Sequence, residues 1–545
     1  MRAANLLVPG FGWVAALACL TLFLGLAGCD GCAGTPTDGC QDEECSFDAD
    51  GSGGEDGQEE EAIQGDEEDG QEESADPLDD GSDGDELDGS DGAEPPARPS
   101  LSWIRTAGGT RWDEGRDVLL TEDGRVVVAG SVFGPAEVFG EPVTGLGWED
   151  VLVSSLSSEG ELLWTWLAGG QHADRAEGIC ATSSGEIAVA GGVIGPSSFP
   201  GPGGQPELVT TVGRLDAFEA LLNDQGTADW VRTYGYWSKE VGRRCATMPD
   251  GSVFFGADRA LSYREDLVFE RRTSDGSRLG GFGAGALGGM YGFVWLGGLC
   301  GKSDGSLVAV GHYFLQAVFA GTDSEILIVG NDLGWGTYVT QFSDPAGDGH
   351  YFAQWAIGNE GAGGSARGVV CLEDGSVLVA GRFFGPRTTF GGIEAAGSGG
   401  WDGFVVKFDA AGQALWALGL GGAGSDGLMD ITLDAGGGFA VTGYAQGPLE
   451  LRGRDGASIP LQGHGGRDVL TAGFDQNGNV LWARLDGGPD EETGLAIASD
   501  PGGDLAVTGW FEGQALFGEG ELEEITLQSY GDRDLFVMKL ERLGP

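Results

Sequence analysis

The stretch Gly400–Gly427, GWDGFVVKFDAAGQALWALGLGGAGSDG, decides the fold because close versions of it recur along the chain. It predicts a strand at Phe404–Phe408, a polar turn, a second strand around Trp416, and a glycine-rich loop that ends at Asp426. A fixed spacing between such segments indicates a repeat architecture. The segments are spaced by 66 residues from Asp150 to Asp216, and again from Asp402 to Asp468 and from Asp468 to Asp534.

A second recurring pattern supports the first. Each copy reads as a strand, a tight turn with Asp-Gly, Ser-Gly or Gly-Gly, and another strand that ends on glycine. Such turns require positive φ and are a strong hairpin signal. The copies are Val118–Gly130, Ile179–Gly191, Cys245–Gly256, Cys300–Gly311, Val370–Gly381, Ile431–Gly443 and Ala496–Gly509.

The two patterns together give each repeat four strands, which we name A to D in chain order. Seven four-stranded repeats in one array predict an all-β fold, a seven-bladed β-propeller over residues 101–545. The third and fourth repeats diverge. Strand C of the third repeat starts at Asp266, but its strand D has no tryptophan, and Gly336 replaces the strand C aspartate in the fourth.

The two ends of the repeat region complement each other. It opens with a lone D-type strand at Trp103 and closes with a C-type strand at Asp534–Leu540. We expect the amino-terminal strand to complete the last blade, which would leave no exposed sheet edge. We also expect the tryptophans at the strand D position to pack between blades; they are Trp103, Trp164, Trp230, Trp416 and Trp482.

The repeat as a whole resembles a known family. A tryptophan, Gly-Gly and an acid are followed by a D-G hairpin, V-x-V-x-G and Asp-x-Phe-Val, as at Trp416, Gly421-Gly422 and Asp426. This pattern is similar to the bacterial β-propeller repeat of lipoproteins and secreted proteins. The resemblance implies a seven-bladed ring and an extracytoplasmic location, and it supplies no catalytic residues.

The amino terminus reads as an export signal. Arg2 precedes an almost wholly apolar segment, residues 6–26, and this segment ends in Leu26-Ala27-Gly28-Cys29. These four residues resemble the bacterial lipobox, which implies that residues 1–28 are a signal peptide and that Cys29 carries lipid. We therefore expect a protein held at a membrane of the bacterial cell envelope, outside the cytoplasm. The choice between inner and outer membrane stays open.

Residues 29–100 are expected to form an acidic, disordered tether. The stretch from Asp42 to Glu94 contains no Lys or Arg, and the whole chain has a formal net charge of -57. Such a composition cannot bury a core, and like charges should extend it. The charge also argues against a nucleic-acid partner.

The tether contains a match to the spacing of an EF-hand calcium loop, formed by Asp48, Asp50, Ser52 and Glu59. Glu55 takes a place that is normally apolar, and no helical pattern flanks the loop. These two departures favour a chance match in an acidic tract, and weak calcium binding is the alternative; calcium is the one cofactor that the sequence suggests.

The cysteines fall into two groups. Two of Cys32, Cys40 and Cys45 in the tether could pair. The others hold similar positions in consecutive repeats, where we expect them to be too far apart to bridge and to act as buried thiols. They are Cys180, Cys245, Cys300 and Cys371.

The D–A and B–C loops should share one face of the propeller, which we call the loop-rich face. An acid recurs there four places after the Gly-Gly of the D–A loop, at Asp113, Asp174, Glu240, Asp426 and Glu492. These acids could line one end of the central channel and bind a cation, or each could cap backbone amides of its own turn. Trp112, His172 and Trp237 would make the same rim chemically mixed.

The sequence therefore favours a lipid-anchored monomer that binds an envelope protein or a glycan through its loop-rich face and catalyses no reaction. The alternative is an extracytoplasmic enzyme. The pairs Asp409/Trp416 and Asp475/Trp482 resemble the tryptophan-docking motif of quinone-dependent dehydrogenase propellers, and rim carboxylates could serve a hydrolase or lyase.

Overall fold

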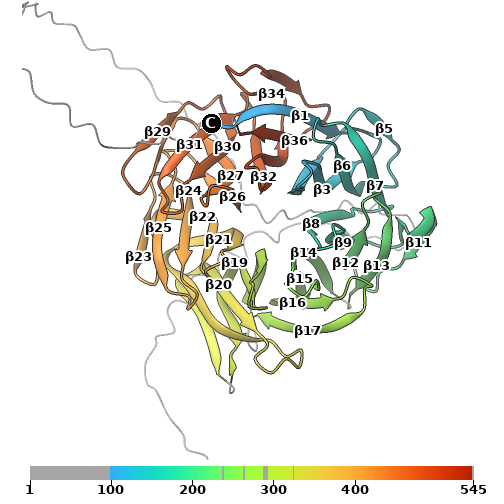
Figure 1. Ribbon diagram of the computed structural model, residues 1–545, viewed down its shortest axis with the longest axis horizontal. Helices are drawn as coiled ribbons and strands as arrows, with labels where there is room; N and C mark the ends of the chain where they lie inside the picture. Colours follow the sequence, from blue (N-terminus) through green and yellow to red (C-terminus); the bar gives the residue numbers. More distant parts are fainter. Residues whose placement is uncertain (1–97, 236–237, 262–263, 286–291, 323–324, 543–545) are drawn as a thin grey trace, which may run out of the picture. The chain divides into compact units, whose positions relative to one another are not determined.

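The computed structural model describes residues 98–235, 238–261, 264–285, 292–322 and 325–542. Within these ranges the chain consists of β-strands with one short 3-10 turn, η1 (Pro202–Gly204), and no α-helix. The strands form consecutive four-stranded antiparallel units around a common axis (Figure 1). The described part of the chain therefore has an all-β, propeller-like fold.

Each unit runs outward from the axis in chain order, so its first strand is innermost (Figure 1). The first three units are β2 (Glu114–Leu120), β3 (Val126–Phe133), β6 (Glu149–Leu156) and β7 (Leu162–Gly170); β8 (Arg175–Ala181), β9 (Ile187–Val193), β12 (Asp216–Leu222) and β13 (Ala228–Tyr234); and β14 (Lys239–Thr247), β15 (Val253–Leu261), β16 (Arg264–Arg272) and β17 (Arg278–Gly285).

The long strand β21 (Phe352–Cys371) serves two units, as the outer strand of one and the innermost strand of the next. The remaining units are β18 (Gly292–Gly301), β19 (Leu307–Ala320), β20 (Ile326–Ser343) and β21; β21, β22 (Val377–Phe390), β24 (Trp401–Phe408) and β25 (Ala414–Leu420); β26 (Gly427–Leu433), β27 (Phe439–Gln446), β30 (Arg467–Phe474) and β31 (Val480–Asp486); and β32 (Glu492–Ser499), β33 (Leu505–Phe511), β36 (Asp534–Glu541) and β1 (Ser100–Gly108).

The last unit is closed by the amino-terminal strand, as the sequence predicts. Strand β1 pairs antiparallel with β36, from Ser100 opposite Glu541 to Ala107 opposite Leu535. The outer edge of β36 is thereby covered by a strand from the other end of the repeat region, and this joins the first unit to the last.

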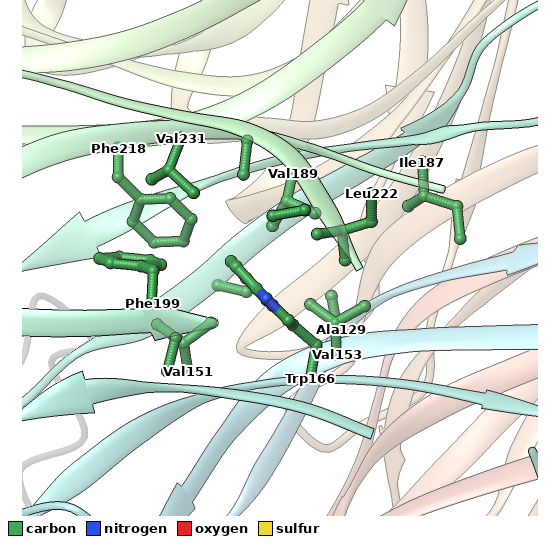
Figure 2. Packing of buried hydrophobic residues seen from close by; sticks show 14 of the residues in the cluster. Ala129, Val151, Val153, Trp166, Ile187, Val189, Phe199, Phe218, Leu222 and Val231 are labelled. Carbon is green, nitrogen blue, oxygen red and sulfur yellow. The ribbon is translucent and has the colours of Figure 1, made fainter. Parts of the chain in front are cut away.

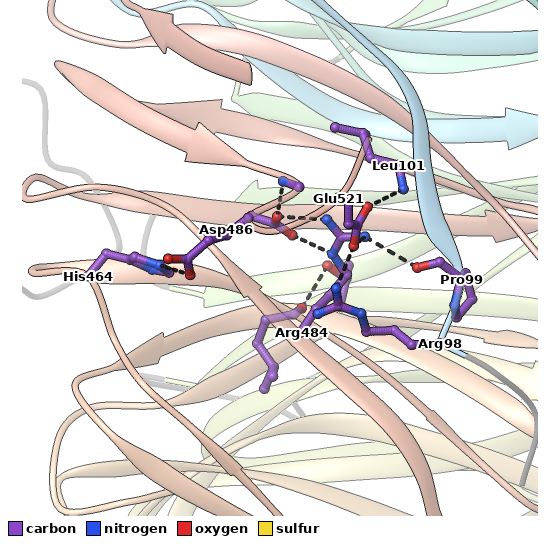
Figure 3. Close-up of polar contacts among 11 residues, drawn as sticks. Arg98, Pro99, Leu101, His464, Arg484, Asp486 and Glu521 are labelled. Atoms are coloured by element: carbon purple, nitrogen blue, oxygen red, sulfur yellow. Dashed lines mark hydrogen bonds and ion pairs between the residues drawn. The ribbon is translucent and has the colours of Figure 1, made fainter. Parts of the chain in front are cut away.

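A buried ionic network fixes the start of β1 (Figure 3). Arg484, 2% exposed, donates to Asp486 at 2.7 and 2.8 Å and lies 3.2 Å from Glu521. Glu521 in turn accepts from Arg98 at 2.7 Å and from the backbone amide of Leu101 at 2.6 Å. Charges this deep are stable only when all are paired, so the network specifies where the chain enters the sheet.

The core lies between neighbouring units. Strands B and C alternate side chains toward the unit before and the unit after, which explains why their sequences are almost continuously apolar. Between the first two units Trp166, Phe199 and Phe218 form one such layer, with ring centroids 5.6 and 5.1 Å apart (Figure 2). Each fully buried side chain of this size contributes about 1.5–3 kcal/mol.

The strand D tryptophans pack between units, as expected. All except Trp482 lie on the glycine of the C–D turn of the following unit, where an added Cβ would approach the indole ring within 3.4 Å. Trp103, Trp164 and Trp230 also donate their indole NH to a carbonyl of that turn, at 2.7–2.9 Å. The pairs are Trp103/Gly160, Trp164/Gly226, Trp230/Gly276 and Trp416/Gly478, together with Trp355/Gly412, which the sequence analysis did not include. Trp482 packs against residues of β1.

The expectation that the cysteines of the repeats stay unpaired is wrong. Cys180 and Cys245 form a disulfide with Cα atoms 5.8 Å apart, and Cys300 and Cys371 form another at 5.9 Å. The bridges join β8 to β14 and β18 to β21. Innermost strands of neighbouring units converge at the axis, so positions that are far apart in the sequence come within bridging distance there.

The innermost strands share a second feature, a β-bulge at the same height in every unit. At each bulge one residue has no partner in strand B and lies toward the neighbouring innermost strands. The bulge residues are Arg116, Glu177, Arg243, Gly297, Arg367, Met429 and Leu495.

Candidate functional site

The five recurring acids of the D–A loops are buried; four of them accept hydrogen bonds from backbone amides, and Glu240 accepts one from the Ser238 hydroxyl. Asp174 accepts from the amides of Gly170 at 2.6 Å and Ile194 at 2.7 Å, and Asp426 accepts from Gly422 at 2.6 Å and Gln446 at 2.9 Å. Their side chains therefore do not project into the centre of the ring. This geometry agrees with the capping interpretation, and it holds each D–A loop in a fixed shape. The members are Asp113, Asp174, Glu240, Asp426 and Glu492, all at most 1% exposed.

Most of these acids face the strand C aspartate of the preceding unit. On Gly169, an added Cβ would lie 2.4 Å from Asp150 Oδ1 and 3.1 Å from Asp174 Oδ2, so the two carboxyl groups meet over the glycine. Burial raises the pKa of Asp113 and Asp174 to about 7 and that of Glu492 to about 8. The pairs are Asp113/Asp534, Asp150/Asp174, Asp402/Asp426 and Asp468/Glu492.

The other predicted rim residues lie on separate loops. Trp112 is 45% exposed and the Arg533 guanidinium lies 5.2 Å from its ring, and His172 is exposed beside Gly195 on the next D–A loop. Trp237 lies outside the described residues, as do the lipidation site Cys29 and the calcium-loop candidates Asp48, Asp50, Ser52 and Glu59.

A cluster that the sequence analysis missed lies on the loop-rich face of the β18–β21 and β21–β25 units. In the first of these, Trp295 stacks on Phe293 and Trp335 with ring centroids 5.5 Å apart in both cases and interplanar angles of 12° and 11°. Phe314 closes on Trp335 at 5.0 Å. Trp335 is nonetheless 47% exposed, so this stack presents an aromatic face to solvent.

The next unit continues the array. Phe384, 58% exposed, lies 5.8 Å from Trp401, and it is paired across the sheet with Gly363, which lies against Trp335. Phe314/Trp335 and Phe384/Trp401 are cross-strand pairs at equivalent places in the two units. We call the six residues Phe293, Trp295, Phe314, Trp335, Phe384 and Trp401 the aromatic shelf.

Polar side chains lie against the shelf. His312 stacks on Trp295 at 4.8 Å, and its Nδ1 lies 3.1 Å from Ser365 Oγ. Ser365 is paired across the sheet with Arg382, whose guanidinium lies 4.9 Å from the Trp401 ring centre. Aromatic faces are thus combined with donors and acceptors in one place.

Burial and then the charges of Arg367, Arg382 and Arg243 lower the pKa of His312 well below its usual value. His312 is therefore neutral at physiological pH, and one ring nitrogen can accept a hydrogen bond while the other donates. The arginines make the surroundings of the histidine electropositive.

The backbone beside the shelf is strained. Leu315, which follows Phe314, has a φ of 72° and is one of two non-glycine residues with positive φ among those described. A left-handed leucine costs on the order of 1–2 kcal/mol, and such strain clusters at functional sites. Leu315 lies at the register shift of β19, between Phe314, which pairs with Trp335, and the outer part of β19, which pairs with Ile326–Gly330.

The sequence did contain a signal for this cluster. The third and fourth repeats diverge from the consensus. In a repeat array, residues that depart from the shared sequence pattern are not required for the packing common to all repeats and can serve a function. Positions that most repeats share, such as the acids of the consensus, stand out when repeats are aligned, whereas Trp295, His312 and Trp335 do not. The tryptophans of the apparent quinone-docking motif are occupied by packing; Trp416, for example, is 7% exposed.

Neither a protein-family model nor a curated protein sequence matches the chain. Among solved structures, it is similar to the polysaccharide lyase Uly1, with a TM-score of 0.40 and 10% identity over 79% of this chain and 90% of that chain. The WD40 domain of Pan2 from Neurospora crassa gives a TM-score of 0.36 and 8% identity over 81% and 97%. Similarities of this level carry no argument about function, and the fold description above rests on the strand pairing.

Among the described residues, no group of three or more His, Cys, Asp or Glu side chains is arranged to hold a metal ion. The same part of the chain contains no helix that is long and apolar enough to cross a membrane.

Proposed function

We propose that this chain is a lipid-anchored, extracytoplasmic propeller of seven blades that binds a carbohydrate through the aromatic shelf and catalyses no reaction. The blades are the four-stranded units described above. The proposal keeps Cys29 as the lipid attachment site, the acidic tether as a spacer, and a monomeric state.

The observation that carries the proposal is the exposed stack on Trp335. Large aromatic side chains normally bury most of their surface, and here two neighbouring units each leave one open, Trp335 and Phe384. The faces of pyranose rings carry C–H groups that pack on aromatic rings, while sugar hydroxyl groups need donors and acceptors at the edge. His312, Ser365 and Arg382 supply such groups beside the shelf.

The disulfides between units support an extracytoplasmic site of action, because disulfides are typical of oxidising compartments. Strand β1 starts beside the C–D turns, where Trp103 and Arg105 donate to carbonyls of Ser158 and Gly160, and it ends at the loop-rich face. The start of β1 at Ser100 therefore lies on the face opposite the shelf.

The proposal is tested by the binding of the full chain, in detergent, to an immobilised panel of oligosaccharides, followed by calorimetry with those bound. Trp335→Ala should weaken binding at least about tenfold, because a stacking anchor of this kind is worth 1–2 kcal/mol or more. Trp148→Ala is the matched control, since Trp148 is 55% exposed on the same face but outside the shelf.

Equal loss of binding in both variants, or none in Trp335→Ala, would show that the shelf is not the binding surface. If the chain binds no saccharide and instead captures an envelope protein through Trp335, the scaffold function that the sequence favours replaces the carbohydrate.

A further inference from the structure

We infer that the saccharide bound by the aromatic shelf is an acidic one, with carboxylate or sulfate groups that bind to arginines at the axial edge of the shelf. The inference rests on the proposed function and adds the chemical class of the ligand.

The bulges of the innermost strands bring arginines together at the axis. Arg116 and Arg243 flank Glu177 with nitrogen–oxygen distances of 3.5 and 3.3 Å, and Arg243 also contacts Asp258 at 2.8 Å. The four side chains therefore form one network across the first three units. Arg243 is thus paired with two carboxylates, and it is also the smallest of three arginine charges that lower the pKa of His312.

The other two charges come from the unit that carries the second half of the shelf. Arg367 is the bulge residue of that unit, two places after Ser365, which contacts His312. Arg382 is the strand partner of Ser365, and its Nη1 donates to the Tyr444 hydroxyl at 3.0 Å. The Arg382 guanidinium lies over the ring of Trp401, and this contact restricts its orientation.

This basic environment is unusual in a chain with a formal net charge of -57. The corresponding cross-strand position of the first unit carries Glu149, where the shelf carries Trp335 and Trp401. All the charged side chains that shift the pKa of His312 are arginines. A local positive potential attracts anionic ligands, while the negative charge over the rest of the protein repels them.

The chemistry of the guanidinium group favours carboxylate and sulfate. Its planar set of donors matches two oxygens of either group at once, and stacking on an aromatic ring fixes the fork in advance. A sugar ring packed on Trp335 or Phe384 would direct its acidic substituent toward Arg382 and Arg367, while its hydroxyl groups meet His312 and Ser365.

The test compares a neutral, a uronate and a sulfated oligosaccharide of equal length for binding to the full chain at 50 and 500 mM sodium chloride. The acidic probes should bind at least about tenfold more tightly than the neutral probe at low salt, and high salt should reduce this advantage. A uronate preference assigns the anionic group as carboxylate, and a sulfate preference assigns it as sulfate ester.

Arg382→Met should abolish the preference for the acidic probes over the neutral one, because the charge is lost while the stem on Trp401 stays. Arg382→Lys should retain part of the preference, since it keeps charge without the fork. The matched control is Arg111→Met on the same face, where the guanidinium lies 5.1 Å from the Phe133 ring.

If all three probes bind equally and Trp335→Ala abolishes that binding, the acidic-ligand inference fails and the proposed function stands. If no probe binds, both fail. A preference that survives in both Arg382→Met and Arg382→Lys also overturns the inference, and thermal unfolding of each variant shows whether it is folded.

Discussion

At the scale of single residues, the carboxyl pairs are the most informative groups. Each pair is buried over a glycine, and within it Asp150 Oδ1, Asp402 Oδ1 and Glu492 Oε1 have no hydrogen-bond partner among the described residues. Two adjacent buried carboxylates cannot both be ionised without a large cost, so the pair retains a proton. We therefore interpret the acids that the sequence suggested as ligands differently: each shares a proton with a neighbouring carboxyl group and holds its loop in shape.

These pairs predict that the stability of the protein depends on pH. Because the pKa of Glu492 is about 8 in the folded chain and near 4.5 in the unfolded chain, the folded state holds more protons across that window. The free energy of unfolding should therefore fall as pH rises from 5 to 8, by about 1.4 kcal/mol per pH unit for each such group. Urea denaturation at several pH values measures this slope.

Glu492→Gln should flatten part of the slope, because the amide can still accept from Gly488 and no longer titrates. Glu159→Gln, at an exposed acid of a C–D turn, is the control and should leave the slope unchanged. A stability that is flat or rising between pH 5 and 8 would contradict the shared proton.

At the scale of elements, the contact between one unit and the next depends on a turn glycine beneath a tryptophan. The C–D turn of each unit needs a residue with positive φ, and only glycine also leaves room for the indole of the preceding unit. Two of these contacts also carry a covalent link: the Cys180–Cys245 bridge joins the units that Trp230 and Gly276 connect, and the Cys300–Cys371 bridge joins the units that Trp355 and Gly412 connect.

Two glycine substitutions separate the backbone effect from the packing effect. Gly412 has a φ of 81°, and an added Cβ would lie 2.5 Å from the Trp355 ring; Gly305 has a φ of 82° with nothing within 4 Å. Gly305→Ala should cost about 1 kcal/mol, and Gly412→Ala about 1–3 kcal/mol more because the tryptophan must move. Equal losses in chemical denaturation would show that Trp355 does not lock the units together.

At the scale of the whole molecule, the ring is held together by β1, which closes the last unit from the other end of the chain. Leu101 and Ile104 of β1 are buried in the same cluster as Phe536 and Met538 of β36, and Glu521 binds both Arg98 and the amide of Leu101. Closure therefore uses backbone pairing, apolar burial and ion pairing at once.

A chain that begins at residue 110 should lose this closure. It exposes the edge of β36 and the apolar surface beneath β1, so we expect self-association. Size-exclusion chromatography with light scattering should show oligomers for this chain and a monomer for a chain that begins at Arg98. A synthetic peptide of residues 98–109 should restore the monomer. A stable monomer without the peptide would mean that the ring closes without β1.

Much of the architecture could be predicted from the sequence, because it is encoded locally and repeated. The Asp-Gly type turns set the hairpins, the short apolar runs between them set the strands, and the split C and D strands set the closure through β1. The contacts of Trp103 and Trp416 between units followed from the same repetition. Signals that recur in every unit are averaged over many copies, so single departures do not hide them.

The site and the covalent links were decided by the tertiary structure. Cys180 and Cys245, or His312 and Ser365, lie more than 50 residues apart in the sequence and meet only because neighbouring units pack side by side around the axis. The aromatic shelf joins residues of five strands from two units. Contacts between distant residues depend on the relative placement of whole sheets, and a local sequence pattern carries no information about that placement.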